Sequence, residues 1–267
     1  MTGILFQARN GRCLQARKKI QWELIRVGGH FILTLALVLL TPAARAATND
    51  FFAQATEFNR AGEFSAAAAA LQKEIKLQPS AGALLNLGLA EWQGGRAGAA
   101  ILAWERVKWI DPFDARAQQN LKFARAVVQV DEPELKWHEI ISTWLPPNVW
   151  LWLAGSGLWL AVGAAVLPRV FRWRKSGGQQ ALAALGFGLF IFALTANVGV
   201  VSRTNLGVVL KKNAVLQLTP TRDGEVVAAL AAGEPGRRIK ERGMFYFIRT
   251  ATTAGWVARE SFGLINE

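Results

Sequence analysis

The chain has 267 residues, a hydrophobic content of 52% and a formal net charge of +12. This composition is too apolar for one ordinary soluble domain, and a lone cysteine, Cys13, excludes disulfides and cysteine-based catalysis for the rest of the chain. The charge is unevenly distributed: +6 in residues 1–46, −2 in residues 47–148, +4 in residues 169–175 and +4 after residue 201. Half of the net charge therefore belongs to a targeting segment rather than to a nucleic-acid-binding surface.

The first 46 residues have the features of a secretory signal. Basic residues, Lys18 and Lys19 among them, precede a short apolar core from Phe31 to Leu40, and an A-R-A sequence at 44–46 offers a cleavage site. A core of ten residues is short for a membrane span and typical of a signal peptide. We predict a signal peptide with a long n-region at 1–46. Whether it is cleaved or stays as an anchor, the residues that follow are exported.

Residues 47–130 contain two repeats in register and half of a third. A period near 34 with small, aromatic and proline residues in order is the tetratricopeptide (TPR) pattern of paired antiparallel helices. Small residues let the helices cross closely, glycines form the turns and prolines end each pair. The half repeat, residues 115–130, predicts a capping helix, and so short a solenoid needs support from the membrane or a partner. The positions that recur at an offset of 33 are Phe51/Leu84, Ala55/Gly88, Gly62/Gly95, Ala67/Ala100, Leu71/Trp104 and Pro79/Pro112.

The repeat pattern also places candidate partner-binding residues on the first helix of each pair. By resemblance to peptide-binding TPRs, Asn86 and Asn120 hold the position whose amide can bond the backbone of an extended peptide. The alternative is that these asparagines cap helices or face solvent. The other residues expected on or near the same concave face are Arg60, Leu89, Trp92 and Phe123.

A linker at 131–148 joins the repeats to the first apolar run. Within it one face of a short helix is apolar, and this face either lies among lipid headgroups or packs on the repeats. Pro146 and Pro147 would then turn the chain into the membrane. The apolar face consists of Trp137, Ile140, Ile141, Trp144 and Leu145.

Two charge-free runs of 19 and 21 residues are close to the roughly 20 residues that cross a bilayer. We predict transmembrane helices at 149–168 and 181–201 rather than buried core helices, because neither run has a polar face. Asn197 in the second fits helix packing better than a transport site. The loop at 169–180 carries four cations and no acid, so the positive-inside rule makes it cytoplasmic and puts both flanking domains on the far side.

Residues 208–267 alternate short β-rich runs with glycine and proline turns. Five or so strands in about 60 residues predict a small barrel, which the membrane hairpin should separate from the repeats. The order of motifs resembles the bacterial SH3-like domain, with a turn at Pro220, an L-x-x-G sequence at 230–233 and a closing G-W-V sequence at 255–257.

The aromatic residues of this segment are its candidate core and site. We place Trp256 in the core together with at most one of Phe245 and Tyr246, because adjacent residues of a strand point to opposite faces. The other aromatic would then lie on the outer face near arginines, where it suits a polymer or peptide ligand. Tyr246 and Trp256 are therefore the candidate site residues of this domain.

The residue inventory argues against an enzyme. His30 lies in the signal, which leaves His138 as the single histidine after it, so neither a Ser-His site nor a zinc peptidase site can be assembled. Acidic residues such as Glu57, Glu63 and Glu74 fall at exposed helical spacing, and no phosphate-binding loop is present. We expect no catalytic activity, no cofactor and no metal site.

The combination of elements resembles the BatE-type proteins of the bacterial aerotolerance cluster. Residues 84–88, 100–106 and 111–121 carry the resemblance most strongly. It implies a multidomain membrane protein: an all-α TPR solenoid, a two-helix transmembrane hairpin and a small all-β SH3-like barrel. It also implies a non-enzymatic scaffold in the bacterial inner membrane with both soluble domains in the periplasm. The implied partners are von Willebrand A-domain membrane proteins and a MoxR-type ATPase. The alternative is that the SH3-like domain binds peptidoglycan or an envelope peptide, with the repeats as a spacer.

Overall fold

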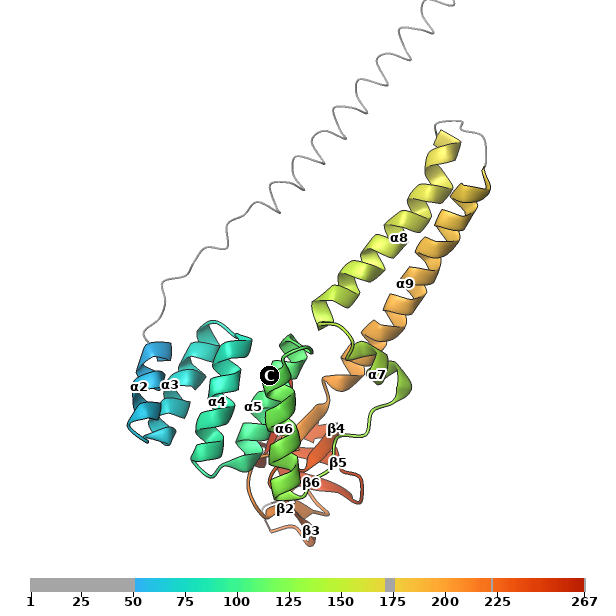
Figure 1. The fold of residues 1–267 in the computed structure, drawn as a ribbon. Helices are drawn as coiled ribbons and strands as arrows, with labels where there is room; N and C mark the ends of the chain where they lie inside the picture. Colours follow the sequence, from blue (N-terminus) through green and yellow to red (C-terminus); the bar gives the residue numbers. More distant parts are fainter. Residues whose placement is uncertain (1–50, 171–175, 222, 267) are drawn as a thin grey trace, which may run out of the picture. The chain divides into compact units, whose positions relative to one another are not determined.

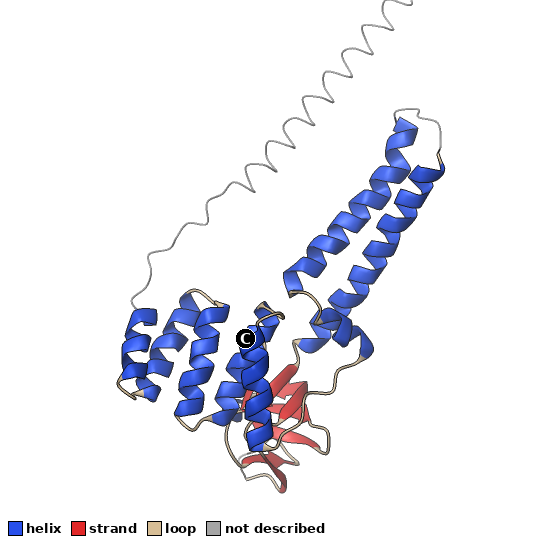
Figure 2. Ribbon diagram, viewed as in Figure 1, coloured by secondary structure: helices blue, strands red, loops and turns tan. Residues whose placement is uncertain are grey.

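The computed structural model describes residues 51–170, 176–221 and 223–266. The predicted signal peptide, residues 1–46, lies outside this part of the chain. Within the described residues the chain forms eight α-helices, one short 3-10 helix and seven strands, with the helices first and the strands last (Figures 1 and 2). The predicted order of a helical part and a β part is therefore confirmed.

Five consecutive helices form the first part of the described chain, and each packs against the next. The turns between paired helices contain Gly62 and Gly95, whose φ angles of +78° and +75° favour glycine. Ser80 and Asp114 cap the third and fifth helices of the series with their side chains. The helices are α2 (Phe51–Arg60), α3 (Phe64–Leu77), α4 (Ala81–Gln93), α5 (Ala97–Ile110) and α6 (Ala115–Val128).

Small residues allow these helices to pack closely, as the repeat pattern predicts. Ala67 and Ala100 are completely buried. A Cβ atom on Gly88 would lie 2.6 Å from Cδ1 of Trp104, so α4 can contact this indole only through glycine. Trp104 is itself buried, and its Nε1 donates to Leu85 O (3.2 Å).

The next two long helices, α8 (Pro147–Val170) and α9 (Gly177–Arg203), are both long and apolar enough to cross a membrane. They pack against each other, and a Cβ atom on Gly157 would lie 2.8 Å from the backbone nitrogen of Phe190. Trp152 and Trp159 are each 76% exposed. A core helix of a soluble protein would bury such side chains, whereas lipid can cover them.

Two features of this hairpin bear on the sequence predictions. Asn197 Nδ2 donates to Ala193 O (2.8 Å) one turn earlier in α9, so the amide is satisfied within its own helix. The predicted loop at 169–180 is shortened at both ends, because α8 runs to Val170 and α9 begins at Gly177. Residues 171–175, which contain three of the four predicted cations, lie outside the described residues.

The seven strands form one antiparallel sheet in the order β3-β2-β6-β5-β4-β1-β7. The predicted barrel is thus an open sheet with β3 and β7 at its edges. Strand β7 was not predicted, because this short strand follows a 3-10 helix without a glycine or proline turn. The strands are β1 (Leu206–Val209), β2 (Ala214–Gln217), β3 (Val226–Leu230), β4 (Pro235–Arg242), β5 (Phe245–Arg249), β6 (Ala254–Ala258) and β7 (Phe262–Leu264).

The register of β5 and β6 decides which aromatic residues enter the core of the sheet. Tyr246 pairs with Val257, and both are buried. Phe247 pairs with Trp256 on the opposite face, where both are half-buried and their ring centroids are 5.3 Å apart. The prediction that Trp256 belongs to the core is therefore wrong, and Tyr246 takes that place.

The helical array and the sheet share a hydrophobic core, although α8 and α9 separate them in sequence. Helix α5 packs on β1 and β7, and Arg106 Nη2 donates to Leu264 O (2.9 Å). The support that a short array of helices needs therefore comes from the chain itself, and the expected separation of the two parts is wrong. The shared core includes Ile101, Leu102, Trp104, Leu121, Leu206, Val208 and Ile265.

Candidate protein-binding site

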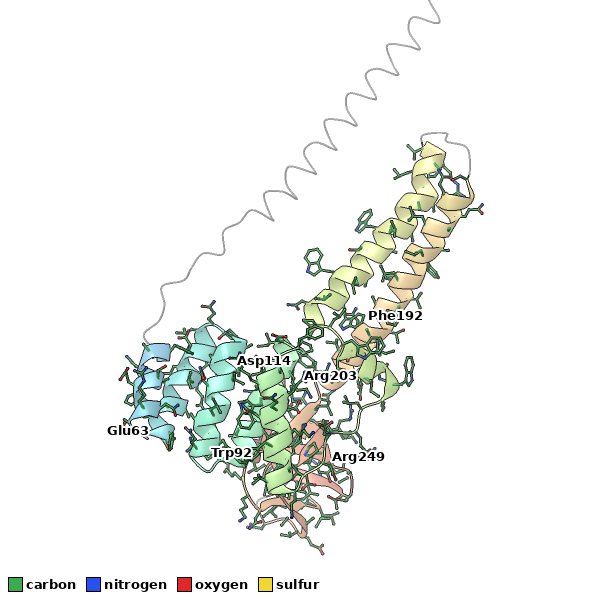
Figure 3. The ribbon with its side chains drawn as sticks, viewed as in Figure 1. Glu63, Trp92, Asp114, Phe192, Arg203 and Arg249 are labelled. Carbon is green, nitrogen blue, oxygen red and sulfur yellow. The ribbon has the colours of Figure 1, made fainter. Side chains whose placement is uncertain are left out.

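Five of the six residues predicted to bind a partner lie on α4 and α6. Trp92 and Phe123 meet edge to face across the two helices, with ring centroids 5.6 Å apart. The ring of Trp92, labelled in Figure 3, also lies 6.1 Å from that of buried Trp104, centroid to centroid, so the indole rests against the core. Phe123 is 58% exposed, and Leu89, one turn before Trp92, is also exposed. We call Asn86, Leu89, Trp92, Asn120 and Phe123 the α4–α6 surface.

The two asparagines of this surface are half-buried and available for binding. The caps of their helices are Ser80 and Asp114, so neither asparagine caps a helix. The side-chain amides of Asn86 and Asn120 make no hydrogen bond with any described residue. A half-buried amide without a partner favours binding over a structural role.

Arg60 is not part of this surface. It ends α2, which packs on α3, and its guanidinium pairs with Glu57 (3.0 Å) where both side chains are exposed. Such an exposed pair contributes little to stability. The prediction that Arg60 joins the concave face is not reproduced by the contacts of the described residues.

A buried ion pair that the sequence analysis did not predict connects three parts of the chain. Glu139 lies on the short helix α7 (Trp137–Ser142) and is 0% exposed. Its carboxylate accepts two hydrogen bonds from Arg237 of β4 (2.7 and 2.8 Å) and one from Ser202 of α9. We call this cluster the Glu139 joint, because it ties α7 and the end of the hairpin to the sheet.

Neighbouring groups extend the Glu139 joint. Arg203, at the end of α9 (Figure 3), donates to the backbone oxygen of Ser142 (3.2 Å), and its guanidinium lies over the ring of Trp109 from α5. Burial by itself would raise the pKa of Glu139. The hydrogen bonds from Arg237, Ser202 and the Lys136 amide outweigh it and lower the pKa to about 2. The carboxylate is thus charged at neutral pH.

The predicted apolar face of the linker helix is divided in the structure. Ile141 and Leu145 pack against the hairpin core around Trp150. A Cβ atom on Gly199 of α9 would lie 2.7 Å from the carbonyl carbon of His138, so α7 packs directly on α9 rather than on the helical array. The remaining apolar side chains, Trp137, Ile140 and Trp144, are exposed beside the membrane-capable hairpin.

The two aromatic site residues of the sheet have different surroundings. The ring of Tyr246 is buried, and the guanidinium groups of Arg238 and Arg259 lie 5.4 and 5.2 Å from its centroid. Tyr246 is therefore a core residue and cannot reach a ligand. Trp256 lies on the outer face with Phe247, so this pair is the accessible aromatic surface of the sheet.

Comparison with known proteins identifies no relative of this chain. No protein-family model matches the chain, and no curated protein matches it. In the part of the chain that the structure describes, no three histidine, cysteine or acidic side chains are grouped as a metal site would require. The imidazole of His138, the single histidine among these residues, meets the ring of Trp137 edge to face, with ring centroids 5.4 Å apart.

Proposed function

We propose that the protein is a non-enzymatic, membrane-anchored scaffold whose α4–α6 surface binds an extended segment of a partner protein. The observation that carries the proposal is the combination of exposed Phe123 and Leu89 with two unpaired asparagine amides on the same surface. Aromatic side chains that are partly anchored in a core are typical hot spots of protein interfaces. The amides would bond the backbone of the segment, while the rings would bury its apolar side chains.

The setting we propose is that of the BatE-type proteins. The helical array would be a TPR domain and the sheet an SH3-like domain, both in the periplasm and anchored to the bacterial inner membrane by α8 and α9. The partners would be von Willebrand A-domain membrane proteins and a MoxR-type ATPase system. The repeat positions and the two membrane-capable helices support this setting.

Replacing Asn86 and Asn120 together by alanine should weaken partner capture about thirtyfold, if each amide contributes about 1 kcal/mol of binding. Co-purification of a von Willebrand A-domain partner from solubilised membranes measures this loss. The matched control is Asn148→Ala with Asn266→Ala, two exposed asparagines away from the surface. Unchanged capture by a folded Asn86/Asn120 variant would contradict the proposed surface.

The orientation of the protein in the membrane gives a separate prediction. Protease added to intact spheroplasts should cleave both the helical array and the sheet and leave a fragment that contains α8 and α9. The reason is that the cations from Arg169 onward should stay in the cytoplasm. A cytoplasmic marker protein should remain intact until detergent is added. A sheet that is protected before lysis would rule out the two-span topology.

A second candidate function is binding of peptidoglycan or an envelope peptide through the sheet. The half-buried pair of Phe247 and Trp256 on the outer face favours it, because such rings stack on sugars and apolar side chains. The capture experiment separates the two functions. Under this alternative Trp256→Ala, rather than the double asparagine variant, should lose the partners.

A further inference from the structure

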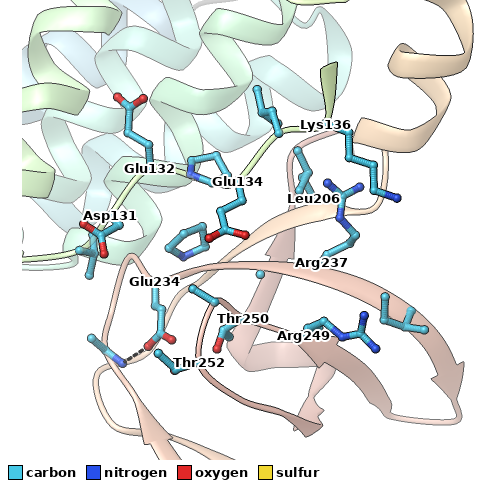
Figure 4. Close-up of a pocket in the computed structure, with 18 of the residues that line it drawn as sticks. Asp131, Glu132, Glu134, Lys136, Leu206, Glu234, Arg237, Arg249, Thr250 and Thr252 are labelled. Carbon is cyan, nitrogen blue, oxygen red and sulfur yellow. Dashed lines mark hydrogen bonds between the residues drawn. The ribbon is translucent and has the colours of Figure 1, made fainter. Parts of the chain in front are cut away.

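A pocket of about 520 Å³ lies between the linker that precedes α7 and the sheet (Figure 4). One wall is residues 129–136. The other consists of the turn at 231–236 and the loop at 249–252. Apolar side chains such as Leu135, Leu206 and Ile239 line its interior. The volume falls in the range of about 300–1,000 Å³ that is usual for ligand pockets.

The backbone of the linker wall has unpaired amides. Residues 131–136 form neither helix nor strand, and the amides of Asp131, Glu132, Glu134 and Leu135 make no hydrogen bond with any described residue. Such a segment can pair with an added extended peptide through main-chain hydrogen bonds. The wall therefore offers backbone recognition next to the apolar interior.

The charges of the pocket are separated along its length. In Figure 4, Asp131 and Glu234 lie at one end, Glu134 points into the middle, and Lys136 and Arg249 lie at the opposite end. The side chains of Asp131, Glu134, Lys136 and Arg249 have no hydrogen-bond or ion-pair partner among the described residues. They are therefore free to bind charged groups of a ligand.

The three other charged residues of the pocket are already occupied. Glu132 pairs with Arg125 (3.3 Å), Glu234 accepts a hydrogen bond from the Ala231 amide (3.1 Å), and Arg237 is held by Glu139 in the Glu139 joint. The free cations at one end and the free carboxylates towards the other thus define a dipolar site with an apolar middle. A ligand that matches it carries an anion and a cation separated by apolar groups.

We propose that this pocket binds the C-terminal tail of another polypeptide, with a basic side chain a few residues before the free carboxylate. Arg249 and Lys136 would receive the carboxylate, because guanidinium and carboxylate groups form charge-assisted, often bidentate hydrogen bonds. Glu134 and Asp131 would receive the basic side chain, and the tail between them would run along the linker. This site is distinct from the α4–α6 surface and does not depend on it.

Fluorescence anisotropy with the purified full chain in detergent micelles tests the proposal. The probe is a synthetic peptide, labelled at its N-terminus, that ends in Lys-Ala-Leu-Ala-Val with a free carboxylate. Amidation of the C-terminus and replacement of its lysine by glutamate should each weaken binding about tenfold, the loss expected for a charge-assisted contact. Equal affinity for the acid and the amide, or no saturable binding, overturns the proposal.

Variants of the protein locate the two ends of the site. In Arg249→Gln the preference for the acid over the amide should disappear, whereas Glu134→Gln should lose the preference for lysine over glutamate. Arg242→Gln removes a charge at the other end of the same strand pair, opposite Phe245, and should keep both preferences. The Asn86/Asn120 double variant should bind the peptide like the wild type. Unchanged preferences in both pocket variants would overturn the assignment.

Discussion

Replacing Glu139 by glutamine should destabilise the protein by about 3 kcal/mol and loosen the sheet from the hairpin. Removing one partner of a buried ion pair typically costs about 3–5 kcal/mol. We expect the lower end, because Arg237 keeps 20% of its side chain exposed and can be hydrated. Urea-induced unfolding in detergent micelles measures the free energy. Limited proteolysis at the linker, residues 131–136, reports the loosening.

The pH dependence provides the control for this variant. The pKa of Glu139 lies at about 2 in the folded protein against an ordinary value of 4.5. Its ionisation therefore contributes stability that is fully present above about pH 4.5 and is lost as the pH falls towards 2. The difference in stability between wild type and Glu139→Gln should shrink over this window. Glu57→Gln, which breaks an exposed pair, should change the free energy of unfolding by less than about 1 kcal/mol. A constant difference between wild type and Glu139→Gln from pH 7 to pH 2 would refute the assigned role.

Gly98→Ala should separate the helical array from the sheet, at a cost of about 1–3 kcal/mol. A Cβ atom at this position of α5 would lie 2.5 Å from Leu210 O. That backbone cannot move easily, because Leu210 N donates to Ser261 O (2.9 Å) and Val209 O accepts from Gly233 N (2.8 Å). Hydrogen exchange in β1 and β7 should therefore become faster.

The substitution Gly82→Ala is the matched control, because it separates the effect of the steric clash from the effect of helix propensity. Gly82 of α4 has no neighbouring atom within 4 Å of a Cβ position. Gly82→Ala should therefore stabilise the protein by up to about 1 kcal/mol through helix propensity alone. If Gly98→Ala stabilised the protein as much as Gly82→Ala does, α5 would not pack on β1 as closely as described.

The local features of the fold were predictable because they depend on neighbouring residues. Gly62 and Gly95 mark turns that need positive φ, and two uncharged runs of sufficient length predict the hairpin. The face of Trp256 was not predictable. Alternation along a strand separates two faces but does not say which of them is inside, and the register with β5 decides that.

The long-range contacts could not be predicted for a related reason. Glu139 and Arg237 are 98 residues apart in sequence, and the glutamate has the spacing of a solvent-facing residue on an amphipathic helix. Gly98 and Leu102 likewise fit an ordinary helix, although they contact the sheet. By contrast, the resemblance to peptide-binding TPRs named the residues of the α4–α6 surface in advance, and their role in binding stays a prediction.

The short connection between the hairpin and the sheet would fix how the protein presents its proposed binding surface. Helix α9 ends at Arg203 and β1 begins at Leu206, while Arg238 N donates to Asn205 O (2.8 Å) across the connection. Without a flexible tether, the sheet and the helices packed on it should keep one height and one direction above the bilayer. A membrane-anchored partner would then meet the α4–α6 surface by lateral diffusion alone, at a high effective concentration if its own segment stands at the same height. A partner held at another height would be excluded, however well its sequence matched.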